Sequence, residues 1–122
     1  MLNWLKPVTT AAFLTIGGLA MAQDKVTLIN VFAVPEGRYD ETLKMWKAAK
    51  EIMQGQPGYI STRLHSALDP TATYRLINIA EWESPRHFRA AAEVLRASEL
   101  PEVEGLTFHP MLYTRVEDGA SN

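Results

Sequence analysis

The chain has 122 residues with 14 acidic and 12 basic side chains, and it contains no cysteine. This mild acidity gives no reason to expect nucleic acid or an anionic membrane surface as a partner. The lack of cysteine excludes disulfides, a thiolate nucleophile and a thiolate metal site.

Residues 1–22 have the three parts of a secretory signal. Lys6 is the only charged side chain among them, an apolar stretch runs from Val8 to Ala20, and Ala20-Met21-Ala22 forms an A-x-A cleavage site. The apolar stretch has about thirteen residues, whereas a membrane-spanning helix needs ~20. We therefore expect cleavage after Ala22, a single mature domain of residues 23–122, a periplasmic or secreted location and no stable membrane association afterwards. An uncleaved membrane anchor is the alternative.

A strand and a helix are predicted to open the mature chain. Asp24 to Val34 is rich in β-branched residues and apolar on both parities, which indicates a strand covered on both faces and ended by Pro35. Glu36 to Gln54 is predicted to be a helix whose apolar residues recur every three or four positions: Tyr39, Leu43, Trp46, Ala49 and Met53.

Three further strands and a second helix are expected after it. Tyr59 to Ser66 alternates as a strand does, Asp69-Pro70 begins a turn, and Thr73 to Trp82 is the next strand. Ser84 and Pro85 suit the N-cap and first position of the second helix. Leu106 to Val116 is the last strand, in which Pro110 indicates an edge position or a bulge.

The predicted order is β-α-β-β-α-β, which is typical of the α+β ferredoxin-like fold. That fold has a four-stranded antiparallel sheet with both helices on one face. The other face would carry apolar side chains that the chain itself does not cover, namely Ile29, Val31, Ile77 and Ile79. A second copy of the sheet is the simplest cover, so we expect a homodimer through this face.

The segment from Val26 to about Ala92 resembles the antibiotic biosynthesis monooxygenase (ABM) domain, also described as the dimeric α+β barrel. The resemblance is carried by Ile29-Asn30-Val31-Phe32, Val34-Pro35-Glu36-Gly37, Pro57-Gly58-Tyr59, Arg63-Leu64-His65, Asn78-Ile79-Ala80-Glu81-Trp82-Glu83-Ser84 and Phe88. It implies a monooxygenase that uses no cofactor and acts on a small quinol or phenolic aromatic. A non-catalytic dimeric module for a small aromatic ligand is the main alternative.

Asn30 is the first candidate catalytic residue, because an amide in an apolar strand needs hydrogen-bond partners. It shares a parity with Leu28 and Phe32, which are candidate substrate-binding residues. The resemblance implies that Asn30 lines a cavity between sheet and helices and holds a substrate oxygen or dioxygen. The alternative is that it bonds a neighbouring backbone group at a bulge.

Asn78 and Trp82 are candidate catalytic residues on the third strand, and Tyr74 shares their parity. Together with Phe88 on the second helix, Tyr74 is expected to contact a planar ring. The alternative for Trp82 is packing against that helix.

His65 is the candidate base, because a histidine near its ordinary pKa can take a proton from a quinol hydroxyl. A surface position at the end of the strand is the alternative. His65, His87 and His109 are not spaced as metal ligands, so no metal site is expected.

Haem binding or degradation is a further alternative that the resemblance raises. Haem-degrading relatives carry a Trp and an iron-ligating His on the second helix and beyond it. Ala91 and the segment from Glu99 to Pro101 occupy those places here. The sequence departs from the haem-degrading pattern at both.

Overall fold

The structure, a computed structural model, describes residues 24–119, and the predicted signal and cleavage site lie outside these residues. Six elements follow in the order β1 (Val26–Ala33), α2 (Tyr39–Met53), β2 (Tyr59–Ser66), β3 (Leu76–Trp82), α3 (Pro85–Arg96) and β4 (Thr107–Tyr113). Their β-α-β-β-α-β order confirms the predicted arrangement.

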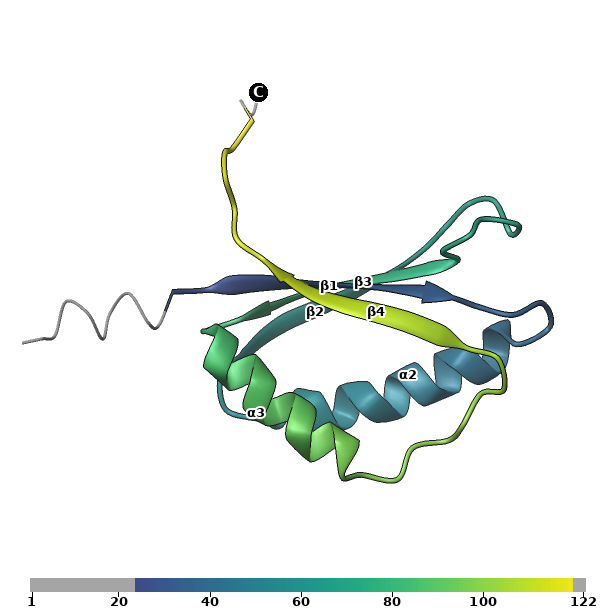
Figure 1. Cartoon of the computed structure of the whole chain (residues 1–122), viewed down its shortest axis with the longest axis horizontal. Coiled ribbons are helices and arrows are strands. Elements are labelled where there is room, and N and C mark those ends of the chain that lie inside the picture. The colour runs from purple at the N-terminus through teal and green to yellow at the C-terminus, as the bar shows by residue number, and fades with distance from the viewer. Residues whose placement is uncertain (1–23, 120–122) are drawn as a thin grey trace, which may run out of the picture.

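The four strands form one antiparallel sheet in the order β2-β3-β1-β4. Both helices lie on the same side of it, as Figure 1 shows, and leave the opposite side bare. This confirms the ferredoxin-like fold. We call the bare side the open face; its central strands carry Ile29, Val31, Ile77 and Ile79.

The proline of β4 sits at an edge of the sheet. Pro110 is the partner of Asn30 in an uninterrupted register between β1 and β4, and β4 is an edge strand of the sheet that residues 24–119 form. An edge strand tolerates a residue without an N–H, because one side of its ladder is unpaired. Of the two predicted reasons for this proline, the edge position is the one observed.

A bulge occurs instead at the start of β2, where the register shifts between Tyr59 and Ser61. The extra residue moves Tyr59 to the side of its partner Trp82, and their rings meet edge-on with centroids 5.6 Å apart. The simple alternation predicted for this strand, with Tyr59 and His65 on one side, is therefore wrong at its first residues.

The helices begin where local chemistry allows. Ser84 is the N-cap of α3, and its hydroxyl accepts a hydrogen bond from the backbone N–H of His87, as predicted. The first helix starts at Tyr39, three residues later than predicted, because Gly37 takes a φ of 81° in the turn before it.

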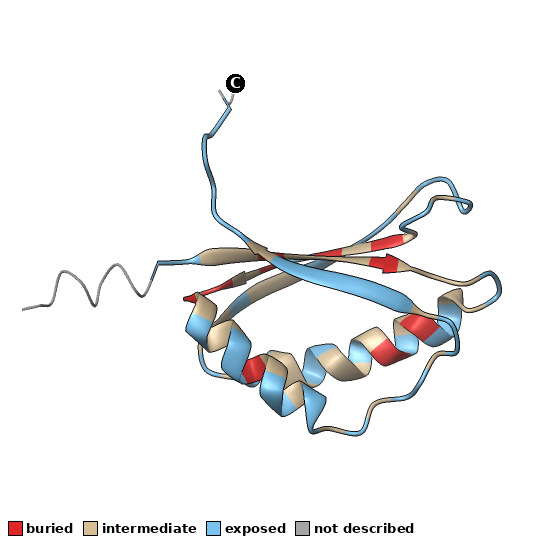
Figure 2. Cartoon of the chain, viewed as in Figure 1, coloured by how far each residue is buried: buried red, intermediate tan, exposed pale blue. Residues whose placement is uncertain are grey.

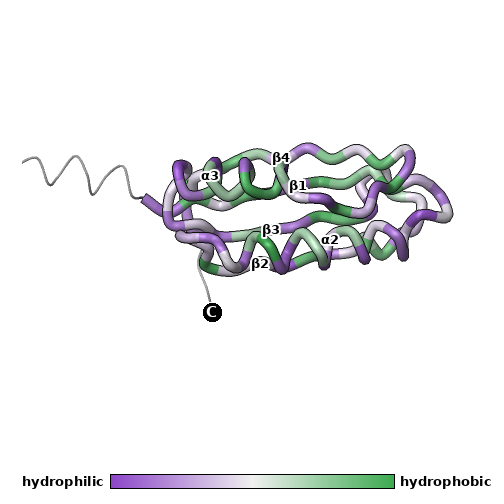
Figure 3. The backbone as a smooth tube through the Cα atoms, turned by 90° about the horizontal axis from the view of Figure 1, so that it is seen from below, coloured by the Kyte–Doolittle hydropathy of each residue, from purple (hydrophilic) through white to green (hydrophobic). Residues whose placement is uncertain are grey.

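Hydrophobic and hydrophilic segments alternate along α2 (Figure 3). None of the helices within residues 24–119 is long and apolar enough to cross a membrane.

The loop between β2 and β3 is longer than the sequence pattern indicates. The β3 strand starts at Leu76 rather than Thr73, and the turn at Asp69 is closed by Thr71. The Asp69 carboxylate accepts hydrogen bonds from the backbone N–H of Thr71 at 2.8 Å and from its hydroxyl at 2.7 Å. These bonds, the backbone one first, hold the pKa of Asp69 below its usual value.

The buried core forms two clusters between the sheet and the helices. Figure 2 marks buried segments in red on the sheet and on both helices. One comprises Leu28, Ala80, Trp82 and Ala91. The other comprises Phe32, Met45 and Leu76. Along β1 and β3 the positions between these clusters belong to Asn30 and Asn78. The middle of the apolar layer is therefore crossed by a pair of amides.

Candidate functional site

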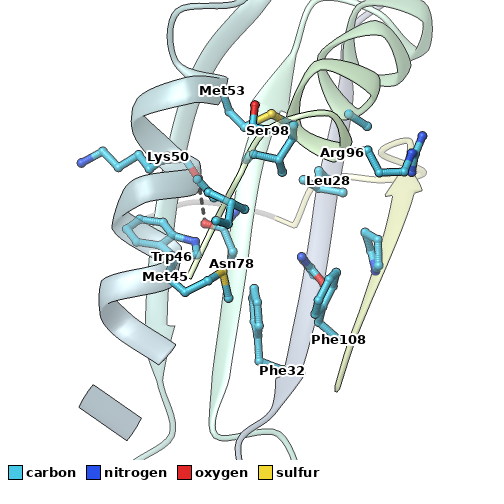
Figure 4. Close-up of a pocket in the computed structure, with 18 of the residues that line it drawn as sticks. Leu28, Phe32, Met45, Trp46, Lys50, Met53, Asn78, Arg96, Ser98 and Phe108 are labelled. Atoms are coloured by element: carbon cyan, nitrogen blue, oxygen red, sulfur yellow. Dashed lines mark hydrogen bonds between the residues drawn. The ribbon is translucent and has the colours of Figure 1, made fainter. Parts of the chain in front are cut away.

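A cavity of about 900 Å³ lies on the helix-covered side of the sheet. Figure 4 shows Phe32, Asn78 and Phe108 extending from the strands into the same space as Met45 and Trp46 of α2. The segment between α3 and β4 closes part of it with Leu100, Val103 and Leu106. A mostly apolar cavity with few polar groups is the usual form of a small-molecule site.

Asn30 and Asn78 lie directly opposite each other in the register of β1 and β3, and both line the cavity. Directly opposed residues of an antiparallel pair have Cβ atoms only ~5 Å apart. The sequence pattern placed each amide on the face of its apolar neighbours, and the register brings the two together.

Thr62 completes this polar row. Its hydroxyl donates to Asn78 Oδ1 at 2.7 Å, and the Asn78 side chain is only 8% exposed. Thr62 pairs with Ala80 and so reaches Asn78 diagonally across the β2–β3 ladder. Thr62 was not among the predicted site residues; the available signal was a hydroxyl on the same parity as Leu64.

Two polar atoms in the walls are buried without a hydrogen-bond partner among the described residues: Asn30 Oδ1 and Trp82 Nε1. Buried polar atoms are nearly always satisfied, so each such atom needs an explanation. One is an acceptor and the other a donor. Both can be satisfied by a polar molecule in the cavity, which both residues line.

The aromatic side chains surround this polar row. Trp82, 1% exposed, packs edge-on against Phe88 with ring centroids 5.8 Å apart. The ring centroid of Phe108, on β4, lies 5.7 Å from that of Phe32. Leu28, Phe32 and Phe88 line the cavity, as expected of substrate-contacting residues. Phe108 also lines it but was not predicted, because Pro110 obscured the orientation of the last strand.

His65 does not belong to this site. It pairs with Ile77, which pairs with Val31, so it lies in an open-face row on the opposite side of the sheet. The bulge at Tyr59 is the reason that the face of β2 was hard to assign. His65 cannot take a proton from a molecule in the cavity, and its interpretation as the base is corrected.

Tyr74 is also placed outside the cavity. It precedes β3 in the loop from β2 and is 43% exposed. The expected wall of Tyr74, Asn78 and Trp82 therefore loses its first member, because the chain enters the sheet only at Leu76.

The charged residues near the cavity lie at its rim, and the described residues form no cluster of metal-binding side chains. Lys50, Arg96, Glu102 and Glu104 are exposed residues at the rim of the cavity. His87 packs against Gly58 and contacts Ser84 Oγ through its Nδ1 at 2.7 Å. Among residues 24–119, no group of three or more His, Cys, Asp or Glu side chains comes together as a metal site would require.

A family model described as antibiotic biosynthesis monooxygenase matches residues 25–96, which is more than half of the chain. The chain belongs to the antibiotic biosynthesis monooxygenase family. A similar solved structure is that of a candidate monooxygenase from Shewanella loihica PV-4, with 40% identity and a TM-score of 0.71. The match covers 78% of this chain and 97% of that one.

Other solved structures extend the comparison of this ABM domain. SnoaB, a cofactor-independent oxygenase from Streptomyces nogalater, is 27% identical with a TM-score of 0.59, and the match covers 78% of this chain and 96% of SnoaB. The haem-degrading protein Rv3592 from Mycobacterium tuberculosis is 22% identical with a TM-score of 0.52, and the match covers 78% and 97% of the two chains. At 22% identity, the likeness to Rv3592 shows a shared fold and nothing about function. A search of curated proteins found no match.

Proposed function

We propose that this ABM domain is a cofactor-independent monooxygenase acting on a small quinol or phenolic aromatic. The observation that carries the proposal is the polar row of Asn30 and Asn78 inside an otherwise apolar cavity of about 900 Å³. The likeness to SnoaB, which is described as a cofactor-independent oxygenase, supports it.

The cavity offers what such a reaction needs from a protein. The walls are mostly apolar, and the aromatic rings of Trp82 and Phe88 can stack against a planar substrate. The substrate supplies its own electrons: the ring loses two hydrogen atoms and gains one oxygen atom from dioxygen, and the second oxygen atom leaves as water. No separate reductant is required.

Deprotonation of the substrate is the step that the walls must favour. The inner walls contain amides, a hydroxyl and an indole, whereas the carboxylates of Glu102 and Glu104 belong to exposed residues at the rim. Donors aimed at a phenolic oxygen stabilise its anion and lower its pKa. We infer that Asn78 Nδ2 and Trp82 Nε1 hold the substrate oxygens, and that Asn30 Oδ1 accepts from a hydroxyl.

A non-catalytic module that binds a small aromatic is the second candidate. The observation that favours it is the position of His65 on the open face, which leaves the inner walls without a histidine base. The same cavity and the same amide row would then recognise a ligand without transforming it.

The residues of the cavity do not fit a haem site. The residues that line the cavity include neither His nor Cys. His87, in the first turn of α3, packs against Gly58. Ala91, at the place of the Trp of haem-degrading relatives, is buried in the core.

Oxygen uptake separates the two candidates. The domain would be incubated aerobically with a panel of quinols and hydroxylated naphthalenes or anthracenes, with binding followed by quenching of tryptophan fluorescence. Uptake of one dioxygen per substrate, with one oxygen atom in the product, is expected. Binding without uptake would favour the binding module, and the absence of both would contradict either function. Tyr74→Phe is the control variant: it should bind and react as the wild type does, because Tyr74 lies outside the cavity.

A further inference from the structure

Thr62 contacts the Asn78 amide at the wall of the cavity. Its hydroxyl donates to Asn78 Oδ1 at 2.7 Å, the bond drawn as a dashed line in Figure 4. We propose that Thr62 is a positioning residue that holds Asn78 with its NH₂ group toward the bound molecule. The proposal rests on the proposed function in one respect, that this molecule carries a phenolic oxygen.

An asparagine side chain has two nearly isosteric orientations with opposite hydrogen-bonding character. Turning the amide exchanges an acceptor for two donors at almost no change in shape. Shape alone therefore does not select the orientation, and the hydrogen bonds of the amide must do so. A threonine hydroxyl can donate to the amide oxygen or accept from its NH₂ group, and here it donates to Asn78 Oδ1. Of the neighbours on this side, Leu64 and Ala80 have side chains that cannot hydrogen-bond, whereas Asn30, the partner of Asn78 on β1, has an amide whose Oδ1 makes no hydrogen bond among the described residues.

The orientation of the Asn78 amide matters because a second amide, that of Asn30, lies opposite it on β1. Asn30 lies directly opposite, and its Oδ1 is a buried acceptor without a partner among the described residues. With Oδ1 of Asn78 held by Thr62, the amide row presents an acceptor from Asn30 and a donor from Asn78. A phenolate oxygen can accept from that donor while a second hydroxyl of the same ligand donates to Asn30.

Without the Thr62 hydroxyl the Asn78 amide can turn, and its oxygen can then face the cavity. An oxygen there repels a phenolate and accepts from a neutral phenol. Thr62 therefore sets the protonation state that the site prefers, although it does not itself have to touch the reacting atoms. This preference is a measurable property of a bound phenol.

The test uses 2-naphthol, whose absorption spectrum changes on ionisation, bound to the wild type, Thr62→Val and Thr62→Ser. The valine variant keeps the shape and removes the hydroxyl, and the serine variant restores the hydroxyl. We expect the pKa of bound naphthol to rise by about one unit in Thr62→Val, a tenfold loss of preference for the anion. Thr62→Ser should return it to within a third of that shift.

A ligand-free readout accompanies the titration. The side-chain amide signals of Asn78 in ¹H–¹⁵N spectra, assigned with Asn78→Ala, should move in Thr62→Val and keep their positions in Thr62→Ser. A purely structural role would change the melting temperature without changing the naphthol pKa. If Thr62→Val does not fold, Thr62→Ala replaces it in both measurements.

The outcomes are distinct. An unchanged naphthol pKa in the variant lacking the hydroxyl, or a serine variant that behaves like it, overturns the proposal. A wild type that binds no naphthol overturns both this proposal and the proposed function. A wild type that binds naphthol, shows the Thr62 effect and consumes no oxygen with naphthohydroquinone supports the positioning role and contradicts only the monooxygenase activity.

Discussion

At the scale of single residues, Asn30 is the most informative position of the chain. It interrupts a strand whose inward neighbours, Leu28 and Phe32, belong to the two buried core clusters. Its Oδ1 is buried without a partner among the described residues. Leaving a buried acceptor unsatisfied costs roughly 1–3 kcal/mol, so an amide retained there needs a use other than packing.

Replacement of Asn30 should separate function from stability. We expect Asn30→Ala and Asn30→Leu to lose at least about tenfold in binding or turnover on the quinol panel, since about 1.4 kcal/mol corresponds to a factor of ten. Asn30→Leu should melt at the wild-type temperature or above, because it removes the unsatisfied acceptor. Melting is followed by circular dichroism and turnover by oxygen uptake.

The same pair of variants can contradict this assignment in two ways. A leucine variant that is more stable and equally active would mean that Asn30 is a tolerated polar residue. Unfolding of both variants would mean that the amide holds the backbone rather than a ligand.

At the scale of elements, the contact between the start of β2 and the first turn of α3 locates one end of the cavity. Gly58, with a φ of 86°, precedes the bulge, and a Cβ atom there would clash with Cβ and Cγ of His87. His87 is itself tied to the N-cap Ser84. Tyr59 and Phe88, which follow Gly58 and His87 in sequence, both pack edge-on against Trp82.

Two glycines with the same backbone conformation provide a test of this contact. Gly37→Ala, at a φ of 81° with open space around it, should cost about 1–2 kcal/mol of unfolding free energy, the cost of the left-handed region. In Gly58→Ala, the added Cβ atom also clashes with Cβ and Cγ of His87. We therefore expect this variant to lose at least about 2 kcal/mol more unfolding free energy than Gly37→Ala, as overpacking does. Urea unfolding measures both; equal losses would show that α3 moves away without cost.

At the scale of the whole molecule, the open face is the feature that the single chain leaves unexplained. Its central strands carry Ile29, Val31, Ile77 and Ile79, and the helices lie on the other side of the sheet (Figure 1). Ile79 is 36% exposed. We propose that a second copy of the sheet covers this face, as expected from the sequence.

The dimer prediction is tested by placing a charge on the open face. Burying an apolar side chain of this size is worth roughly 1.5–3 kcal/mol, and burying an unpaired carboxylate costs more than that gain. Ile79→Asp should therefore shift the dimer toward monomer in light scattering at micromolar concentration. Val94→Asp, which places the same charge on an exposed apolar position of α3, should leave the mass unchanged. A monomeric wild type would refute the proposal.

Export is the other prediction that belongs to the whole chain. Protein from the native host should begin at Gln23, because Ala20-Met21-Ala22 ends the apolar stretch. Intact mass spectrometry of the periplasmic or secreted fraction checks this. Recovery of membrane-associated protein that begins at Met1 or Leu2 would show that the segment is retained as an anchor.

The sequence by itself determined the order of the elements, the ferredoxin-like fold, and the shared parity of Asn30 with Leu28 and Phe32 and of Asn78 with Trp82. These follow from local periodicities: period two in strands and three to four in helices decide which side chains share a face. The N-cap at Ser84 was predictable for the same reason, since a cap depends on residues within one turn.

Only the tertiary structure decided the register that sets Asn30 opposite Asn78, the bulge at Tyr59, and the contact between Thr62 and Asn78, which are 16 residues apart. Strand pairing is non-local, so periodicity within one strand does not determine it. The β2 strand has polar residues on both parities, so its alternation did not show that His65 lies on the open face. The physical reason is that alternation defines two faces of a strand, whereas the packing of the whole domain decides which one the helices cover.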